Sequence, residues 1–435
     1  MVYRFFIIAF LATVVLNPCL IGQERKVDQK IVKLTAEDGG RSYGVLHTNP
    51  DSQSDIVLVA MHPRSDQTNH FTLAPAASRG MAGFGIAGRH LHQEAFIIKE
   101  ELMLDIAAAI RYLRNDRKYK TVVLIAHSGG GPLLTLYQSQ ATTNSPMRIK
   151  STPAGDPPNL NNYDLPEADA VVTLASHEGE GIHNEHRLDP AVVDESNPYL
   201  VDASLDMYNP DNGYRLPPEE SHYTTTFLKR FRDAQKIRAH RLDVLARSMI
   251  QQQRHYQNLM KSSDFKNLPL KERLEIERKA AAMPLMIIYG TEADPRYMDL
   301  SLDPSDRSLG SNTANTRPDL RNRAPRGASR VLTPRAYLST RSGISSNADM
   351  LKNIAKVSVP TLVICGTADR GIYPSTTRAI YKASQAKDKS LVFIEGANHG
   401  FRPSGSKSGK GDQRTQTLNT IFEWIEERFA KENAP

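Results

Sequence analysis

A serine lies among small residues at the end of an apolar segment, in the sequence Ala126-His127-Ser128-Gly129-Gly130. The run TVVLIAH that leads into it is typical of a buried strand, and PLLTLYQSQA after it is typical of a helix. Small residues two before and two after the serine permit the strained turn that lifts its hydroxyl above a sheet edge. The same turn directs the Gly129 amide at a substrate carbonyl oxygen, where negative charge develops. The pattern predicts Ser128 as a nucleophile and Gly129 as an oxyanion donor.

This turn resembles the nucleophile elbow of the α/β-hydrolase family, usually Gly-x-Ser-x-Gly, with Ala126 in place of the first glycine. The resemblance covers residues 30–176 and 356–432. It implies a serine hydrolase in which an acid and then a histidine follow the serine along the chain. A serine needs such a base because its hydroxyl, at its ordinary pKa, is a poor nucleophile.

Two later loops supply the acid and the base that the resemblance implies. Asp369 follows the apolar run VPTLVICG in a Gly-x-x-Asp turn, and His399 follows SLVFIEG. The 30 residues between them leave room for one helix and one strand, which brings both loops to the sheet edge that carries Ser128. We therefore predict a triad of these three residues. Asp294, in the sequence YGTEADP, is an alternative acid, for which a lid hairpin or a substrate-facing loop is the favoured interpretation.

The family's second oxyanion donor comes from a loop after the third strand, normally with the pattern His-Gly-x. This chain has His62-Pro63-Arg64 at that position. Because proline has no N–H, the amide of Arg64 is the best candidate by position. Two interpretations of the Arg64 side chain stay open, which are contact with an anionic group of the substrate and exposure to solvent.

Short apolar strands alternate with helical stripes on both sides of these loops, which predicts an α/β fold with a mostly parallel sheet flanked by helices. About 180 residues separate Ser176 from Val359, far more than a crossover connection requires. We therefore predict an inserted cap or lid at 177–355, between core segments 23–176 and 356–435. Inside it, residues 227–254 form a cationic amphipathic pattern, which fits a solvated basic face or attraction of an anionic substrate or membrane. The polar stretch 303–330 is predicted to be a mobile loop.

Two other patterns carry ligand-type residues without the right context. The run 83–88 satisfies the dinucleotide pattern G-x-G-x-x-G, but it does not follow a first strand, so no cofactor is predicted. The group His177, Glu178, Glu180, His183 and His186 matches no zinc spacing such as His-Glu-x-x-His. We expect these side chains to line the pocket and predict no metal.

The composition of 435 residues, 40% apolar and 24% charged, excludes a disordered or collagen-like chain. The net charge of +7 is modest for this length, and no nucleic-acid-binding motif accompanies it, so nucleic acid is not a predicted partner. One cysteine, Cys19, lies near the N-terminus, and the other, Cys365, lies in an apolar run. We expect no intramolecular disulfide and no cysteine-based zinc site.

The N-terminus has the layout of a secretory signal, with Arg4, an apolar stretch at 5–16 and then Asn17-Pro18. The apolar stretch is shorter than the roughly 20 residues of a spanning helix. We therefore predict a signal peptide at 1–22 and a secreted or periplasmic protein without a stable membrane span. A lipid anchor at Cys19 is the weaker alternative.

Together these features predict an exported serine hydrolase that cleaves a small carboxylic ester through an acyl-enzyme on Ser128. In this scheme His399 carries the proton, Asp369 holds the imidazolium, and Gly129 with Arg64 stabilises the oxyanion. The same groups also suit an amidase, a peptidase or an acyltransferase. A non-catalytic binding protein on the same scaffold is the alternative of another class, and the intact Ser, Asp and His argue against it. The oligomeric state is left open.

Overall fold

The computed structural model describes residues 27–324, 330–405 and 411–430, so the predicted signal peptide and Cys19 lie outside the described residues. An eight-stranded sheet forms its centre. The strands are β1 (Asp28–Thr35), β2 (Arg41–Thr48), β3 (Ile56–Ala60), β4 (Ala82–Ala87), β5 (Thr121–His127), β6 (Ala170–Leu174), β9 (Thr361–Gly366) and β10 (Lys389–Ile394).

The strand order across this sheet is β1-β2-β4-β3-β5-β6-β9-β10. The β1–β2 and β2–β4 pairings are antiparallel, and the other five are parallel. His127 at the end of β5 pairs with Leu174 of β6, and Gly366 of β9 pairs with Ile394 of β10. The carboxyl ends of these parallel strands therefore meet at one edge of the sheet. This edge carries Ser128 and the two loops of the predicted triad.

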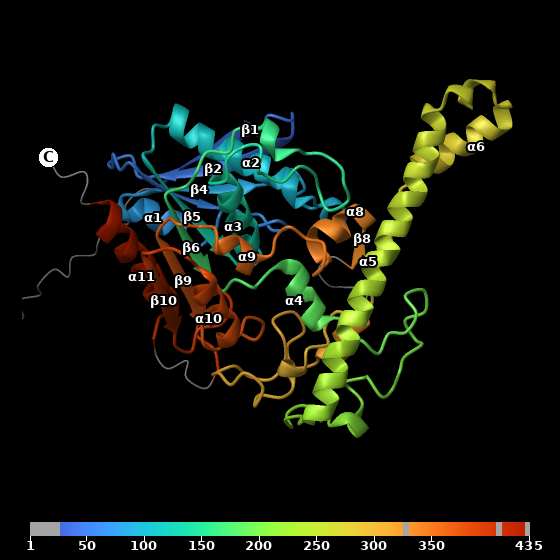
Figure 1. Cartoon of the computed structure of the whole chain (residues 1–435). Coiled ribbons are helices and arrows are strands. Elements are labelled where there is room, and N and C mark those ends of the chain that lie inside the picture. The colour runs from blue at the N-terminus through green and yellow to red at the C-terminus, as the bar shows by residue number, and fades with distance from the viewer. Residues whose placement is uncertain (1–26, 325–329, 406–410, 431–435) are drawn as a thin grey trace, which may run out of the picture.

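Helices cover both faces of the sheet, which gives the three layers of the predicted α/β fold (Figure 1). One face packs against α2 (Lys99–Arg111) and α3 (Gly130–Ala141), and the other packs against α1 (Leu73–Arg79) and α11 (Gln413–Phe429). Alternate side chains of β3 enter the two cores, Val57 and Val59 on one side and Ile56 and Leu58 on the other. These side chains are buried because both faces of a parallel sheet are covered.

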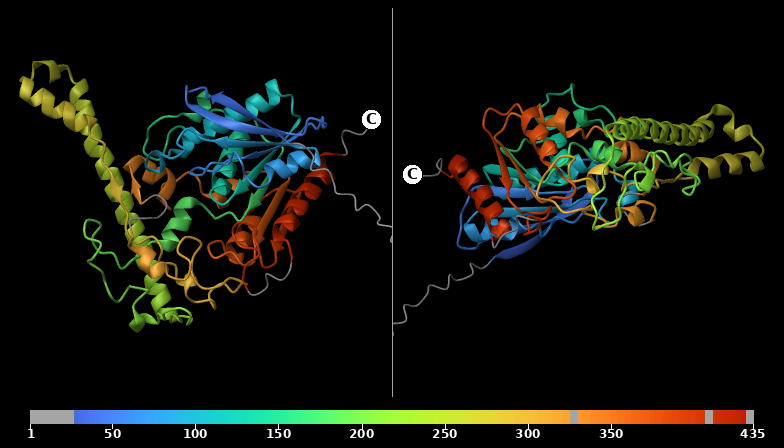
Figure 2. Two further views of the ribbon diagram at one scale, coloured as in Figure 1. Left: turned by 180° about the vertical axis from the view of Figure 1, so that it is seen from behind. Right: turned by 90° about the horizontal axis from the view of Figure 1, so that it is seen from below.

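The long connection between β6 and β9 has two apolar clusters of its own. Its described residues form no strand of the main sheet. Its elements are α4 (Glu180–Arg187), α5 (Thr225–Lys261), α6 (Leu270–Ala281), β7 (Met286–Ile287), α7 (Pro318–Asn322), β8 (Val331–Leu332), α8 (Pro334–Ala336) and α9 (Met350–Ile354). In the views of Figure 2, α5 lies at the opposite end of the molecule from α11, and its outer part projects with α6 folded back beside it. At the end of the connection, α9 packs on α3 of the core.

The predicted cationic pattern at 227–254 is part of the single helix α5, and several of its arginines crosslink the inserted segment. Arg232 pairs with Asp294 at 2.8 Å, and Arg238 pairs with Glu195 at 2.7 Å. The buried guanidinium of Arg238 also donates to the backbone carbonyl of Asp189. Arg232 and Arg238 therefore have partners within the protein, and the buried Arg238 is not part of a solvated basic face. Within the described ranges, no helix combines the length and apolar character that crossing a membrane requires.

Candidate active site

The turn after β5 holds Ser128 in a left-handed backbone conformation, with φ of 54°, and its amide donates to the carbonyl of Leu174 at 2.8 Å. Such strain is characteristic of a nucleophile elbow. The turn packs too closely for side chains on the glycines that follow. A Cβ on Gly130 would lie 2.5 Å from the carbonyl oxygen of Met61, and one on Gly131 would lie 2.4 Å from Oγ of Ser176. The small residues of the motif are therefore required by packing.

Three side chains from the three predicted loops form a continuous hydrogen-bonded chain. Nε2 of His399 lies 2.9 Å from Oγ of Ser128, and Nδ1 of His399 lies 2.7 Å from Oδ2 of Asp369. The carboxylate of Asp369 accepts a hydrogen bond from Nδ1–H of His399, which leaves Nε2 unprotonated and able to accept the proton of the serine. This geometry suits a serine nucleophile activated by a histidine base.

The buried carboxylate of Asp369 is surrounded by hydrogen-bond donors. Its Oδ1 accepts the backbone N–H groups of Gly371 at 2.8 Å and Ile372 at 3.1 Å, and the side-chain amide of Asn312 at 2.7 Å. Burial alone would raise the pKa of Asp369, but His399 and these donors lower it, so the carboxyl is ionised. Burial lowers the pKa of His399, and the Asp369 carboxylate outweighs it, so the net shift of that pKa is upward.

A second chain of histidines anchors the loop that carries His399. Nε2 of His127 bonds the backbone carbonyl of His399 at 3.0 Å, and Nδ1 of His127 lies 3.1 Å from Nε2 of His70. Since a carbonyl only accepts, His127 donates from Nε2 and accepts from His70 at Nδ1. Burial lowers the pKa of His127 to about 4, which keeps this tautomer neutral. Sequence reasoning missed both residues, although His127 is the variable residue of the elbow motif.

The loop after β3 differs from the prediction for Arg64. Its backbone N–H donates to Nδ1 of His62 at 3.1 Å, and the amide of Ser65 donates to the same atom. The turn at Pro63 therefore folds the chain back onto the His62 ring, and the Arg64 amide is used within the loop. Arg64 contributes its guanidinium to the site, where Nε lies 3.1 Å from Oε1 of Glu180.

The same contacts fix the tautomer of His62. Its Nδ1 accepts two N–H groups, and burial lowers its pKa far below the ordinary value, so the neutral ring carries its hydrogen on Nε2. This Nε2 lies against the elbow, because a Cβ on Gly129 would be 2.8 Å from it. No acceptor among the described residues takes the Gly129 amide itself. The Nε2–H group of His62 therefore lies next to Gly129, the residue that follows Ser128.

Ser128 opens into a cavity of about 250 Å³ whose walls come from the core and from the inserted segment. Core residues in the lining include Arg64, Ile372 and His399. The inserted segment contributes polar and charged side chains, among them His177, Glu180, His183, Arg187, Glu292, Asn312 and Arg341. The stretch 303–330, predicted to be a mobile loop, thus contributes Asn312 to the site. Polar groups of this stretch form hydrogen bonds with core residues, such as that between Asn312 and Asp369.

The ligand-type residues after β6 divide between this cavity and the core. His177, Glu180 and His183 are in the lining, as expected, and the rings of His177 and His183 stack with centroids 4.9 Å apart. Burial lowers the pKa of His177 to about 3. Glu178 instead accepts a hydrogen bond from Thr376. The alternative acid Asp294 is bound by Arg232 and Arg296, at 2.8 and 2.7 Å, whereas His399 pairs with Asp369.

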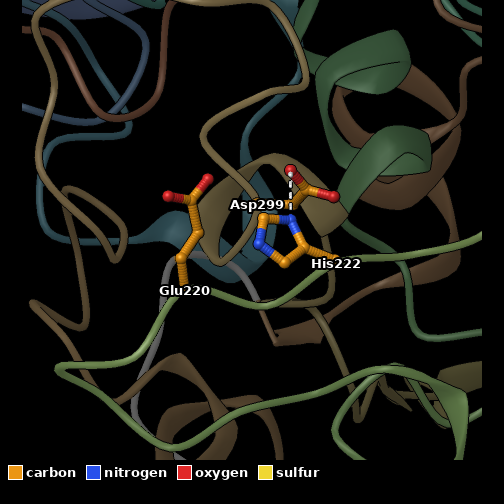
Figure 3. A group of neighbouring side chains, drawn as sticks. All are labelled: Glu220, His222 and Asp299. Atoms are coloured by element: carbon orange, nitrogen blue, oxygen red, sulfur yellow. Dashed lines mark ion pairs between the residues drawn. The ribbon is translucent and has the colours of Figure 1, made fainter.

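A separate group with cation-binding atoms lies in the inserted segment, formed by Glu220, His222 and Asp299 (Figure 3). One possible ligand atom from each lies within 4.8 Å of the others. His222 is 73% exposed and lies 3.9 Å from Asp299. Both carboxylates already accept backbone amides, that of Leu300 at Glu220 and that of Tyr223 at Asp299. These contacts join two loops, and none of the three residues lines the Ser128 cavity.

Comparison with known proteins agrees with this architecture. Residues 331–402, which include Asp369 and His399, match the family model described as serine aminopeptidase, S33. Over 81 residues the chain is 30% identical to caffeoylshikimate esterase of Arabidopsis thaliana, a match that covers 18% of this chain and 23% of that enzyme. The chain thus matches less than a quarter of that relative's length.

Two solved structures resemble nearly the whole chain at low sequence identity. DcsB in complex with its substrate analogue has a TM-score of 0.50 and 10% identity, and the match covers 93% of this chain and 100% of that one. The esterase domain of a Rhodothermus marinus protein has a TM-score of 0.42 and 12% identity, with 92% and 98% covered. The chain therefore has the fold of α/β hydrolases, as the sequence resemblance implied, and its residues 331–402 match a model of a family with that fold. The comparisons support a hydrolase.

Proposed function

We propose that this α/β hydrolase is a serine esterase that cleaves carboxylic esters through an acyl-enzyme on Ser128. The observation that carries the proposal is the chain from Ser128 Oγ to His399 Nε2, at 2.9 Å, and from His399 Nδ1 to the buried Asp369, at 2.7 Å. A histidine held in this way accepts a proton from the serine and is stabilised as imidazolium by the carboxylate.

In the first half-reaction Oγ of Ser128 attacks the ester carbonyl while Nε2 of His399 takes its proton. The tetrahedral intermediate then collapses, the bond to the alcohol oxygen breaks, and His399 returns the proton to the leaving alcohol. In the second half-reaction water attacks the acyl-serine with the same base. The acid product leaves, and Ser128 regains its proton.

We assign the oxyanion contacts to the Gly129 amide and to Nε2–H of His62. Gly129 caps the N-terminus of α3, so the partial positive charge of that helix end adds to the donor. His62 replaces Arg64 in this role because its Nε2–H lies against Gly129, whereas the Arg64 amide bonds to His62. Both donors are fixed before substrate binds, which is the condition for efficient stabilisation of a developing charge.

We propose an esterase and not an aminopeptidase because of the charges in the cavity. The matched family model is named for an aminopeptidase, which must bind a free α-ammonium with an unpaired carboxylate. Here Glu180 is surrounded by Arg64, Lys99 and Arg341, and Glu292 is paired with Arg187. The relative with 30% identity is named as an esterase. Amide cleavage and acyl transfer stay alternatives for the same triad.

We also propose that the inserted segment, residues 177–355, acts as a cap that limits the site to small esters and excludes water. Its support is the share of the cavity wall that this segment supplies. Export through the signal peptide at 1–22 is a further proposal. N-terminal sequencing of the secreted protein would find a start near residue 23, and retention of Met1 on an exported protein would contradict cleavage.

The test of the enzymatic proposal is labelling with a fluorophosphonate probe together with hydrolysis of a 4-nitrophenyl ester. The wild-type protein should be labelled and active, and Ser128→Ala should be neither. Ser308→Ala is the matched control, since Ser308 is an exposed serine outside the cavity lining, and it should keep both properties. Equal labelling of wild type and Ser128→Ala, or labelling of neither, would overturn the proposal.

A further inference from the structure

Three cations surround a single carboxylate in the wall of the Ser128 cavity. Oxygens of Glu180 lie 3.1 Å from Nε of Arg64, 3.2 Å from Nζ of Lys99 and 3.6 Å from Nη2 of Arg341. The Glu180 side chain is 2% exposed, and Lys99 is fully buried. One carboxylate balances one of these three charges, so the cluster carries an excess of positive charge.

Part of the hydrogen-bonding capacity of this cluster is not used within the protein. Nε of Arg64 and Nζ of Lys99 contact the Glu180 carboxylate, whereas the buried atoms Nε and Nη2 of Arg341 have no hydrogen-bond partner among the described residues. Arg341 is 5% exposed, and its closest approach to Glu180 is too long for a hydrogen bond. A buried guanidinium with unpaired donors is costly, which points to a ligand that accepts them.

The other charges near the cavity offset this excess only in part. Arg187 and Glu292 form an ion pair with each other, and Thr313 also donates to Glu292. Glu100 lies close enough to Lys99 to offset its charge, and its oxygens accept hydrogen bonds from Ser339 and Asn347, each at 2.8 Å. In the cavity lining beside Ser128, the two cations Arg64 and Arg341 therefore face the single carboxylate of Glu180.

We propose that Arg341 and Arg64 bind a carboxylate carried by the ester substrate, so that the enzyme prefers esters with a free acid group. This inference rests on the proposed esterase function and names its substrate class. A carboxylate offers two acceptor oxygens, which match the planar donors of a guanidinium. Glu180 acts as a positioning residue, because it holds the cations together while leaving Nε and Nη2 of Arg341 unpaired.

The small volume of the cavity makes the preference strong. A neutral ester that fills the same space of about 250 Å³ leaves the Arg341 donors unpaired and shields them from water. Sites built to bind a polar group reject analogues that lack it far more strongly than apolar pockets reject a missing methylene. The anionic ester should therefore be favoured by at least tenfold in kcat/KM.

The experiment compares matched esters with and without a carboxylate. One pair places it on the acyl side, mono-4-nitrophenyl glutarate against 4-nitrophenyl pentanoate. The other pair places it on the alcohol side, 3-(butyryloxy)benzoate against phenyl butyrate. In at least one pair the wild-type enzyme should prefer the anionic ester tenfold or more. A ratio of one or less in both pairs would overturn the subsite.

Variants then assign the preference to Arg341. Arg341→Met should reduce the ratio of anionic to neutral kcat/KM at least tenfold, and Arg341→Lys should restore part of it. Arg278→Met is the matched control, because it removes the same charge from an exposed position on α6. If Arg341→Met keeps the wild-type ratio, or Arg278→Met lowers it equally, the assignment is wrong.

A binding measurement separates this inference from the esterase proposal. Titration of glutarate into Ser128→Ala, followed by calorimetry, should give a dissociation constant at least tenfold lower than in Ser128→Ala with Arg341→Met. Normal fluorophosphonate labelling of the wild type without any carboxylate preference or glutarate binding would overturn the subsite alone. If no serine is labelled, the esterase proposal fails, and the glutarate titration still decides whether the subsite exists.

Discussion

The side-chain amide of Asn312 donates to Oδ1 of Asp369 at 2.7 Å, so a residue of the inserted segment completes the shell of donors around an acid in the core. The other oxygen of this carboxylate faces His399. The position of the inserted segment is thereby coupled to the charge of Asp369, the acid of the proposed triad. A segment that lines the cavity thus also contributes a hydrogen bond to the network of Asp369, His399 and Ser128.

The first prediction concerns this contact. Asn312→Ala should lower kcat on a 4-nitrophenyl ester about tenfold, since a hydrogen bond to a charged group is worth about 1.5–3 kcal/mol. The pKa of Asp369 should rise, because a donor that lowers it is lost. Thr316→Ala removes an exposed polar side chain from the same loop without touching Asp369, and it should stay within about twofold of wild type. A similar loss in both variants would indicate a general loop effect.

The second prediction is the pH dependence. His399 accepts the serine proton only when it is neutral, so kcat/KM should rise with pH and level off. The Asp369 carboxylate raises the pKa of His399, so the midpoint should lie above the ordinary value of 6.5. Asp369→Asn should move the midpoint down and reduce kcat by about 10⁴. A wild-type midpoint below 6.5, measured between pH 5 and 9 on a neutral ester, would contradict this arrangement.

The third prediction separates two roles of His62. An asparagine at position 62 would place its side-chain oxygen near the position of Nδ1, where it can accept from the amides of Arg64 and Ser65. It would have no donor at the position of Nε2–H. His62→Asn should therefore fold normally and lose about 10²-fold or more in kcat. His62→Gln, which keeps a donor near the position of Nε2, should lose less. Equal kcat in His62→Asn and wild type, with thermal unfolding unchanged, would exclude His62 as an oxyanion donor.

The meeting of Ser128, Asp369 and His399 could be predicted because each lies at the end of a buried strand with a local signature. Ser128 follows β5, Asp369 follows β9 and His399 lies in the loop after β10. The parallel pairing of these strands brings their carboxyl ends together, so local patterns were sufficient. The α/β fold with its mostly parallel sheet is confirmed for the same reason.

The rest of the site depends on contacts between distant segments. The Glu180 cluster joins a loop after β3, the start of α2 and two parts of the inserted segment, and no local pattern encodes such a meeting. The polar stretch around Asn312 has the composition of an exposed loop, and only the folded core supplies its partner. Arg64 was assigned from its position after Pro63, whereas the direction of its amide depends on how the turn folds onto His62.

The last prediction concerns the stability of the cation cluster. Glu180→Gln removes the one carboxylate that balances Arg64, Lys99 and Arg341, and breaking a buried ion pair in this way costs about 3–5 kcal/mol of unfolding free energy. Arg341→Met removes a buried charge whose donors are unpaired, so it should leave that free energy unchanged or raise it. Urea unfolding at pH 7 should therefore give a lower unfolding free energy than wild type for Glu180→Gln and no decrease for Arg341→Met.

The pH dependence of unfolding gives the same prediction an independent readout. Burial raises the pKa of Glu180, but the surrounding cations outweigh it and hold this pKa well below its ordinary value of 4.5. The stabilisation is thus fully present above pH 4.5 and is lost as the pH falls toward the lowered pKa of the folded state. Glu180→Gln should therefore lose less stability than wild type between pH 5 and 3. Parallel curves for the two proteins would show that Glu180 is not the carboxylate that balances the cluster.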